Sequence, residues 1–534
     1  MDRGDSVAVK PLWRTVVERK RELQAKAIAN SCNNEELLPS TPAEIDQICS
    51  ADASDIVRTI ERGKASATFV VQCFMQSLTE VLFSGALKDA RLLDKEFQDS
   101  GKCLKPLHGV PVTVKDQFDV EGVDTTLGYV GRSFRPAAEN AVLVTILKSL
   151  GAVILAKSNL PQSILWCETD NPLWGRTDHP LNRGYTPGGS TGGEAVLLAC
   201  RGSALGWGTD IGGSIRIPSH MMGLYGLKPS SARLPYRGVP VSTDGQEHVP
   251  SSIGPMARSL DDIHLAMKCV INAEPWKMDA RCVPLPWRLE MFTDTLGRPL
   301  TIGVLVDDGV VEPHPPIRRV MAEAEEALRA AGHDVFPWNN ELHRECIQVM
   351  DEFYAADGGE DIRSAIDEGG EPVIPHVQRL LDAAEPITVY QYWQLNKRKW
   401  KLQQAYLDKW TSLRSEKTGR QADVLLMPPM PHSAVPHGQC RWVGYTKVWN
   451  LLDYPALVIP GGRTIRADAD VTFSGEPRNQ LDGWNRNVWE KHGHEMASLG
   501  LPVGLQLICR KFEEEKLLAA GQVLDCLFRK QAMS

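Results

Sequence analysis

The sequence predicts an α/β fold in which a large mixed β-sheet is covered on both faces by α-helices. Short segments that are apolar throughout recur along the chain, as in strands buried on both faces of a sheet. Segments with apolar residues at helical spacing separate these strand candidates. With 534 residues, 43% of them hydrophobic, the chain is long enough to bury such a core.

The first predicted elements lie between residues 110 and 157. Residues 110–114 should form a buried strand, with Lys115 emerging at its end. The segment ENAVLVTILKSLG (139–151) has the apolar periodicity of a helix that ends at a glycine. AVILAK (152–157) follows as a second buried strand.

The same alternation continues in the second half of the chain. Amphipathic helices are expected at residues 315–333 and 512–527. Further strand candidates are LTIGVLV (300–306), ADVLLMP (422–428), YPALVIP (454–460) and PVGLQLICR (502–510). Residues 1–40 have the mixed charge of a helical arm, and nothing after them has the composition of a linker. We therefore expect a charged helical arm over residues 1–40 and one domain with insertions over residues 41–534.

Charge and composition exclude several classes of function. A net charge of −8 gives no basic footprint for nucleic acid or anionic membranes. The chain has no signal-peptide core and no apolar run of about 18 residues, so we expect a cytoplasmic protein without a membrane span. Its 12 cysteines are scattered singly and predict reduced thiols and no metal site. His492 and His494 are expected in an exposed loop.

Three segments contain candidate catalytic residues, and the first is LHGVPVTVKDQFDV (107–120). An apolar environment at the end of this strand would lower the pKa of Lys115, which is how a lysine becomes a base near neutral pH. The alternative is a solvated lysine at the strand end, paired with Asp116.

The second segment is TPGGSTGGEAVLLACRG (186–202). Its glycines surround Ser190 and Thr191 and precede a predicted helix, so backbone N–H groups could form an anion site. It is not a Walker loop, because no G-K-[ST] follows and Glu194 would repel phosphate. A purely structural turn is the alternative.

The third segment is GTDIGGSIRIPS (208–219), which places Ser214 after two glycines. It departs from the G-x-S-x-G nucleophile elbow, because Arg216 stands where the last glycine should be. Glycines let backbone N–H groups approach a substrate closely, and such donors beside a hydroxyl can form an oxyanion hole. No acid–histidine pattern flanks Ser214, so this segment by itself does not identify an activating base.

Taken in order, these segments resemble the amidase signature family. The resemblance is strong in GVPVTVKD, GGSTGGE, GTDIGGSIRIP and GLKPSSARLPYRG, and it extends over residues 45–528. The outer segments CETDNPLWGRTDHP, LLDYPALVIP and PVGLQLICRKFEEEK are similar to the acetamidase-like branch, the general amidases. The resemblance therefore implies the amidase-signature fold, with residues 41–534 as the catalytic domain.

The resemblance also implies a Ser–Ser–Lys triad. In it Ser214 is the nucleophile, Ser190 is a bridging serine on a cis peptide bond, and Lys115 is the base. Expected substrate contacts are Ser190, Ser214, Ile164 near the scissile group, and an oxyanion hole formed by the N–H groups of Ile211, Gly212, Gly213 and Ser214. Asp210 and Arg216 are expected to support this turn rather than react.

The activity implied is hydrolysis of a small-molecule carboxamide to a carboxylate and ammonia or an amine, without metal or cofactor. Family members are often dimers, which makes a homodimer an expected assembly. One alternative is a glutamine-hydrolysing amidotransferase subunit, against which the acetamidase-like segments argue. The other is a catalytically silent ligand-binding relative, because residues 69–87 are shorter than the corresponding segment of relatives and Thr191 stands where the family often has serine.

Overall fold

The computed structural model describes residues 12–32, 41–75, 82–466 and 473–532. Within them, strands form a ten-stranded sheet in the order β2-β1-β3-β5-β4-β9-β10-β8-β6-β7. The strands are β1 Pro111–Lys115, β2 Val153–Ser158, β3 Leu205–Asp210, β4 Tyr225–Lys228, β5 Ser252–Ala257, β6 Thr301–Val304, β7 Asp334–Pro337, β8 Val424–Met427, β9 Ala456–Thr464 and β10 Pro502–Ile508.

The sheet is mixed, as the sequence predicts. Strand β1 runs parallel to both β2 and β3, and β6 runs parallel to both β7 and β8. Between these two parallel groups, the pairs β3–β5, β5–β4, β4–β9, β9–β10 and β10–β8 are antiparallel. The two outer parts of the sheet are thus joined by an antiparallel centre.

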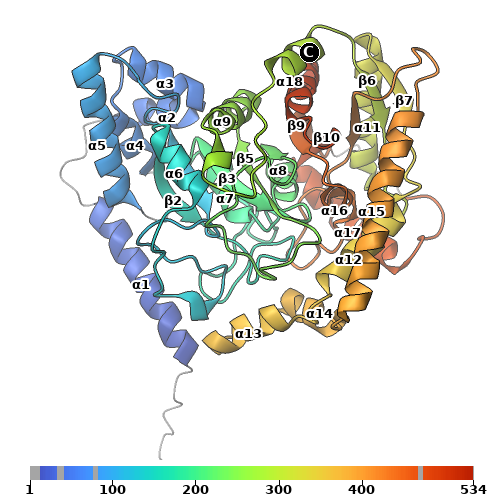
Figure 1. The fold of residues 1–534 in the computed structure, drawn as a ribbon, viewed down its shortest axis with the longest axis horizontal. Coiled ribbons are helices and arrows are strands. Elements are labelled where there is room, and N and C mark those ends of the chain that lie inside the picture. Colours follow the sequence, from blue (N-terminus) through green and yellow to red (C-terminus); the bar gives the residue numbers. More distant parts are fainter. Residues whose placement is uncertain (1–11, 33–40, 76–81, 467–472, 533–534) are drawn as a thin grey trace, which may run out of the picture.

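Helices surround the sheet (Figure 1). The longer ones are α1 Leu12–Cys32, α5 Phe83–Ser100, α9 Leu260–Asn272, α11 Pro315–Ala330, α12 His343–Tyr354, α15 Val389–Ser412, α17 Gln480–Ser498 and α18 Glu514–Ala532. The shorter ones are α2 Pro42–Ser50, α3 Ala53–Glu61, α4 Ala67–Met75, α6 Val142–Ser149, α7 Gly192–Ala199, α8 Arg216–Met222, α10 Leu289–Leu296, α13 Glu360–Gly369, α14 Pro375–Ala383 and α16 Gly444–Leu451, with 3-10 turns η1 Val130–Arg132 and η2 Pro275–Lys277.

Strand β9 shows that both faces of the sheet are covered. Leu457 lies against Gly521 of α18, whereas the next residue, Val458, lies beside Gly504 of β10 and close to His220 of α8. Consecutive strand residues point to opposite faces. Helices α18 and α8 therefore cover opposite faces, which confirms the predicted architecture.

The predicted elements appear close to their expected positions. The helices expected at 139–151 and 315–333 are α6 and α11, and the helix expected at 512–527 is α18. His492 and His494 are an exception: they lie in α17, and the expected loop is wrong. The segment QLDGWNRNVWEKHGHEMAS contains two glycines and few apolar residues, which weakens its helical signal.

Helix α1 corresponds to the expected arm. Lys20 Nζ lies 2.7 Å from Asp124 Oδ2, and Arg21 Nε donates to the Leu173 carbonyl at 2.8 Å. The helix is thus tied to the loops beside η1. The division into residues 1–40 and 41–534 stays a prediction, and the middle of the short segment at 69–87 lies outside the described residues. In the described parts of the chain, no helix combines the length and apolar character needed to cross a bilayer.

Candidate active site

The candidate site lies where two parallel strands end. Val112 to Val114 of β1 pair with Leu205 to Trp207 of β3, so Lys115 and Asp210 end their strands at the same edge of the sheet. The loop before α7 joins them there, because the Thr191 N–H donates to the Ser214 carbonyl at 3.2 Å. The topology therefore brings all three predicted segments together.

Lys115 is completely buried and points at the serine loop. Its Nζ lies 2.7 Å from Ser190 Oγ and 2.9 Å from Thr209 Oγ1. Burial lowers the pKa of Lys115 to about 7, although the Asp210 carboxylate acts in the opposite direction. A solvated lysine paired with Asp116 is therefore wrong: Asp116 Oδ1 lies 3.4 Å from Lys157 Nζ instead.

Ser190 follows a cis peptide bond with Gly189, as the resemblance implies. Its side chain is buried, and Gly189 is needed for the close packing of the loop: a Cβ there would lie 2.6 Å from the Glu168 carbonyl oxygen. Two backbone N–H groups of the loop already have partners: Thr191 N–H donates to the Ser214 carbonyl, and Gly193 N–H donates to the Asn159 carbonyl at 3.1 Å.

Glu194 is buried at the start of α7. It accepts hydrogen bonds from the hydroxyls of Thr113 and Ser158, the latter at 2.7 Å. Burial raises the pKa of Glu194 to about 7, while the two hydroxyls partly oppose the shift. Through these two hydrogen bonds the Glu194 side chain holds α7 against strands β1 and β2.

A buried ion pair supports the turn that carries Ser214. Arg216 Nη2 lies 2.8 Å from Asp210 Oδ1, and both side chains are completely buried. Burial alone would raise the pKa of Asp210, but the Arg216 guanidinium holds it well below its usual range. Asp210 also accepts from the N–H groups of Gly213 at 2.8 Å and Ile215 at 3.1 Å. The pair thus fixes the backbone around Ser214.

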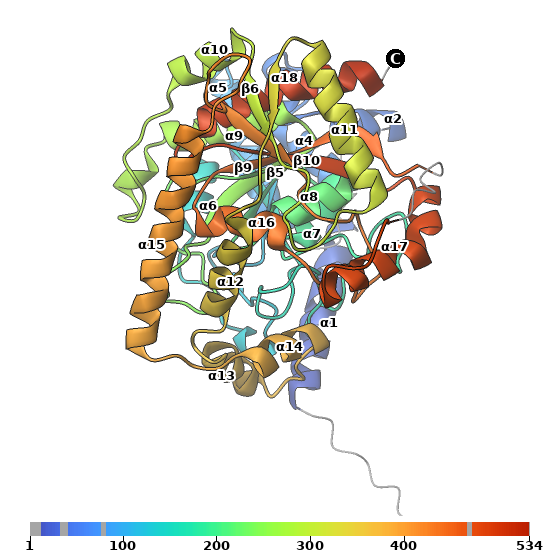
Figure 2. The same ribbon diagram turned by 90° about the vertical axis from the view of Figure 1, so that its right-hand side faces the viewer.

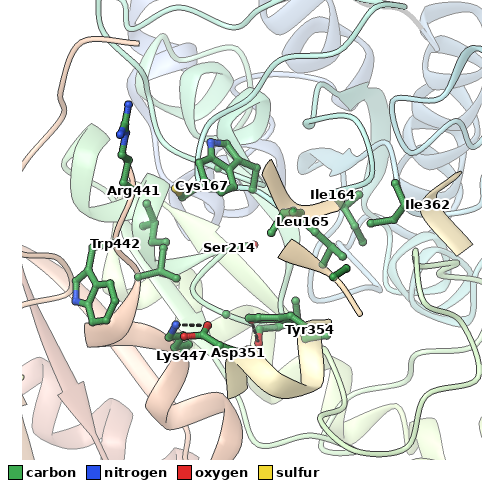
Figure 3. Close-up of a pocket in the computed structure, with 18 of the residues that line it drawn as sticks. Ile164, Leu165, Cys167, Ser214, Asp351, Tyr354, Ile362, Arg441, Trp442 and Lys447 are labelled. Carbon is green, nitrogen blue, oxygen red and sulfur yellow. Dashed lines mark hydrogen bonds and ion pairs between the residues drawn. The ribbon is translucent and has the colours of Figure 1, made fainter. Parts of the chain in front are cut away.

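Ser214 is half-buried and faces a cavity of about 280 Å³ (Figure 3). No hydrogen bond joins its hydroxyl to that of Ser190 within the described residues. Most of the wall is apolar, and Ile164, the predicted neighbour of the scissile group, is part of it. The aliphatic lining residues are Ile164, Leu165, Ile211, Ile217, Ile362, Leu380, Leu381, Ala384, Val443 and Leu481.

The sequence did not indicate the polar residues of this wall. Lys447 of α16 and Asp351 of α12 form an ion pair at 2.5 Å, and the Tyr354 hydroxyl donates to the Ile211 carbonyl at 3.2 Å. In Figure 3 all three lie below Ser214. They are brought there by the packing of two helices distant in sequence, and no local motif marks them.

Comparisons with known proteins identify the family. The Amidase family model matches residues 70–518. "Amidase 1" of Gibberella moniliformis is 51% identical, over 96% of this chain and 99% of its own length. "Acetamidase" of Emericella nidulans is 36% identical, over 96% of this chain and 97% of its own. A solved structure of "Fatty acid amide hydrolase" superposes with a TM-score of 0.88 at 29% identity, covering 97% of this chain and 95% of that one.

The fold and the site define a class of protein: an α/β enzyme in which hydroxyl groups and a buried amine lie beside an apolar cavity. The chain belongs to the amidase signature family, and it is an amide-hydrolysing enzyme.

Proposed function

We propose that the protein is a serine amidohydrolase that cleaves a carboxamide through an acyl-enzyme on Ser214, with Ser190 and Lys115 as the proton relay. The observation that carries the proposal is the 2.7 Å contact between Lys115 Nζ and Ser190 Oγ, two side chains that are both buried. A lysine with a pKa of about 7 is largely neutral at slightly alkaline pH and can accept a proton.

In the first half-reaction neutral Lys115 accepts the proton of Ser190, and Ser190 accepts that of Ser214. Ser214 Oγ attacks the amide carbonyl carbon and forms a tetrahedral oxyanion. Ser190 then delivers a proton to the departing nitrogen, the C–N bond breaks, and ammonia or an amine leaves. Water hydrolyses the acyl-enzyme by the same relay. Substrate binding must bring the two serine hydroxyls within hydrogen-bond distance, a tightening common in enzymes on binding.

The oxyanion would be held by backbone N–H groups of the 211–214 turn. Gly213 N–H donates to Asp210 in this structure, which leaves those of Ile211, Gly212 and Ser214 as the candidate donors. A turn fixed by a buried ion pair needs little reorganisation when charge develops, which is the condition for strong transition-state stabilisation.

The substrate proposed is a small-molecule amide with an apolar acyl group, because the cavity beside Ser214 is lined mainly by aliphatic side chains. The names of the acetamidase and amidase relatives agree with amide hydrolysis, and the net charge of −8 favours a small molecule over nucleic acid. We also propose that the enzyme acts in the cytoplasm.

The test is to incubate the pure protein with aliphatic and aryl amides, without ATP or a partner, and to follow ammonia or amine release. Release by the protein alone, absent in Ser214→Ala, supports the proposal. Glutamine hydrolysis that depends on an added acceptor subunit would indicate the amidotransferase alternative. Binding of amides without turnover would indicate the silent relative.

A further inference from the structure

The backbone carbonyls of residues 210–213, which precede Ser214, each accept a hydrogen bond from another element of the fold. Two of the donors are side chains of α16, another is a side chain of α12, and the last is a backbone N–H of α8. In chain order, the contacts are Asn450 Nδ2 to the Asp210 carbonyl at 3.2 Å, the Tyr354 hydroxyl to that of Ile211 at 3.2 Å, the Thr446 hydroxyl to that of Gly212 at 2.6 Å, and Ile217 N–H to that of Gly213 at 2.7 Å. The orientation of each peptide plane in the turn is therefore fixed by a hydrogen bond.

These contacts also set the direction of the N–H groups that could hold an oxyanion. In a trans peptide the carbonyl and the N–H point in opposite directions, so a fixed carbonyl fixes the N–H of the next residue. The candidate oxyanion donors are the N–H groups of Ile211, Gly212 and Ser214. Each belongs to a peptide whose carbonyl is held, so each donor is oriented by one of the contacts above.

The contact made by Tyr354 differs from the other two that orient candidate donors. The Asn450 side chain also donates to the Asp210 carboxylate at 2.9 Å, so it belongs to the buried ion-pair network. The Ser214 peptide is held by the backbone of α8, which no side-chain substitution removes directly. Tyr354 reaches the turn from a separate helix through one hydroxyl group, so its effect can be separated from that of the ion pair.

We propose that Tyr354 is a positioning residue of the oxyanion hole, whose hydroxyl holds the Ile211–Gly212 peptide so that Gly212 N–H donates to the oxyanion. The inference rests on the proposed acyl-enzyme on Ser214 and adds a residue to its machinery. Tyr354 acts through the peptide and not on the reacting atoms, because its hydroxyl is already used by the Ile211 carbonyl.

The chemistry of Tyr354 fits this role. Burial raises the pKa of Tyr354, so the hydroxyl stays protonated and remains a donor over the working pH range of the enzyme. A hydrogen bond to the carbonyl polarises the peptide and strengthens its N–H as a donor to developing negative charge. Gly212 permits the approach, because a Cβ at this position would clash with the Tyr354 hydroxyl.

Helix α12 is held beside the turn by its contacts with α16. The two helices pack against each other and lie side by side in both views (Figure 1, Figure 2). The ion pair between Asp351 and Lys447, at 2.5 Å, joins them one helical turn before Tyr354. In Figure 3 this pair and Tyr354 lie on the same side of Ser214. A donor fixed in this way needs little reorganisation during the reaction, which is the condition under which such groups stabilise a transition state.

The first experiment separates kcat from KM for the aliphatic amide hexanamide in Tyr354→Phe. Loss of one donor of an oxyanion hole costs about 10²–10³ in kcat, so loss of the support for one donor should cost about tenfold, with KM changed by less than about twofold. Tyr445→Phe is the matched control, because it removes a buried hydroxyl of α16 that donates to the Val311 carbonyl at 2.7 Å, away from the cavity lining. The control should keep the kcat of the wild type. Equal losses of kcat in the two variants, or an unchanged kcat in Tyr354→Phe, would overturn the proposal.

The second experiment uses pentyl trifluoromethyl ketone, which has the acyl chain of hexanamide. Ser214 Oγ adds to the ketone carbon, its proton passes to the relay, and the ketone oxygen becomes an oxyanion in the same place. The inhibition constant should rise about tenfold in Tyr354→Phe, in step with the fall in kcat, and keep its wild-type value in Tyr445→Phe. An affinity for the ketone that does not change in Tyr354→Phe would contradict a role at the oxyanion.

The pH profile distinguishes a positioning residue from a proton donor. Tyr354→Phe should retain the rise of kcat/KM through an apparent pKa near 7, because Lys115 remains the base. Loss of one limb of the profile would assign Tyr354 a proton-transfer step and refute the positioning role.

The wild type tests the proposed function separately. A wild type that neither released ammonia from any amide nor bound the ketone would refute the acyl-enzyme, and the role of Tyr354 with it. An active wild type with an unaffected Tyr354→Phe variant would refute the positioning role alone. An active wild type with matched losses of kcat and ketone affinity in Tyr354→Phe supports both.

Discussion

The ammonium group of Lys115 and the hydroxyl of Ser190 lie 2.7 Å apart although 75 residues separate them in the chain. Neither side chain is open to solvent. A contact of this length between two buried side chains can transfer a proton directly, so the protonation state of the Lys115 amine should govern the pH dependence of the enzyme.

Amidase activity should therefore rise with pH through an apparent pKa near 7, the value to which burial lowers the pKa of Lys115. Lys115→Ala should lose most of its activity, with the largest deficit near neutral pH. Lys115→Arg should not restore it, because a guanidinium stays protonated. The measurement is kcat/KM between pH 5.5 and 9.5. An unchanged profile in Lys115→Ala would exclude this residue as the base.

The lowered pKa of Lys115 should also make the free energy of unfolding depend on pH. The folded-state pKa of about 7 lies below the ordinary value of 10.5, so the unfolded chain binds more protons between these two pH values. The contribution of Lys115 to the free energy of unfolding must therefore rise with pH across this window. Lys115→Met should flatten that rise, as measured by urea unfolding at pH 7 and pH 9. A slope equal to that of the wild type would contradict a lowered pKa.

Ser214→Ala should reduce kcat by roughly 10³-fold or more, because it removes the proposed nucleophile. The fold should persist, since Ser214 is only half-buried and the substitution removes one oxygen. A fluorophosphonate probe should label Ser214 in the wild type, and peptide mass spectrometry locates the adduct. Ser219→Ala, on the adjacent helix, is the matched control and should still be labelled. An adduct on another residue would assign the nucleophile elsewhere.

Asp210→Asn should destabilise the protein by about 3–5 kcal/mol, because it leaves the guanidinium of Arg216 buried without its carboxylate. Glu352→Gln offers a contrast: the side chains of Glu352 and Arg398 are 50% and 39% exposed, and the loss of their ion pair should cost about 1 kcal/mol or less. Chemical unfolding of both variants decides the point. Equal losses would show that the Asp210–Arg216 pair does not hold the turn.

Ala384→Phe should narrow the substrate range. Ala384 lines the cavity, so a phenyl ring there should reduce kcat/KM for amides with large acyl groups about tenfold or more, while acetamide hydrolysis stays close to wild type. Ala383→Phe is the control, because Ala383 is exposed and does not line the cavity. Parallel losses for small and large amides would place acyl binding outside this cavity.

The parts of the fold with strong local signals could be predicted from the sequence. Mostly apolar segments predict strands β1 and β2. In contrast, β3 (LGWGTD) and β5 (SIGPMA) contain glycine or proline and have weak strand propensity. These two strands pair along six residues, and Gly254 allows a backbone approach that a side chain would block. Tertiary packing, rather than local preference, determines them.

The candidate site divides in the same way. Lys115, Ser190 and Ser214 lie in short motifs that can be recognised in the sequence by their glycines and by the order in which they follow one another. Asp351 and Lys447 are 96 residues apart and meet only because α12 packs against α16. An aspartate within one helix and a lysine within another have no pattern that distinguishes them from ordinary surface charges.

The two walls of the cavity have separate origins, and this matters for how the enzyme can diversify. The reactive cluster rests on β1, β3 and the turn before α8, while much of the opposite wall comes from α12, α13, α14 and α16. Tyr354 of α12 contacts the turn that carries Ser214, but the lining residues of α13 and α14 do not. Substitutions in these two helices can therefore alter acyl preference, and a mutant library confined to residues 359–384 can explore new amides while the chemical machinery is inherited unchanged.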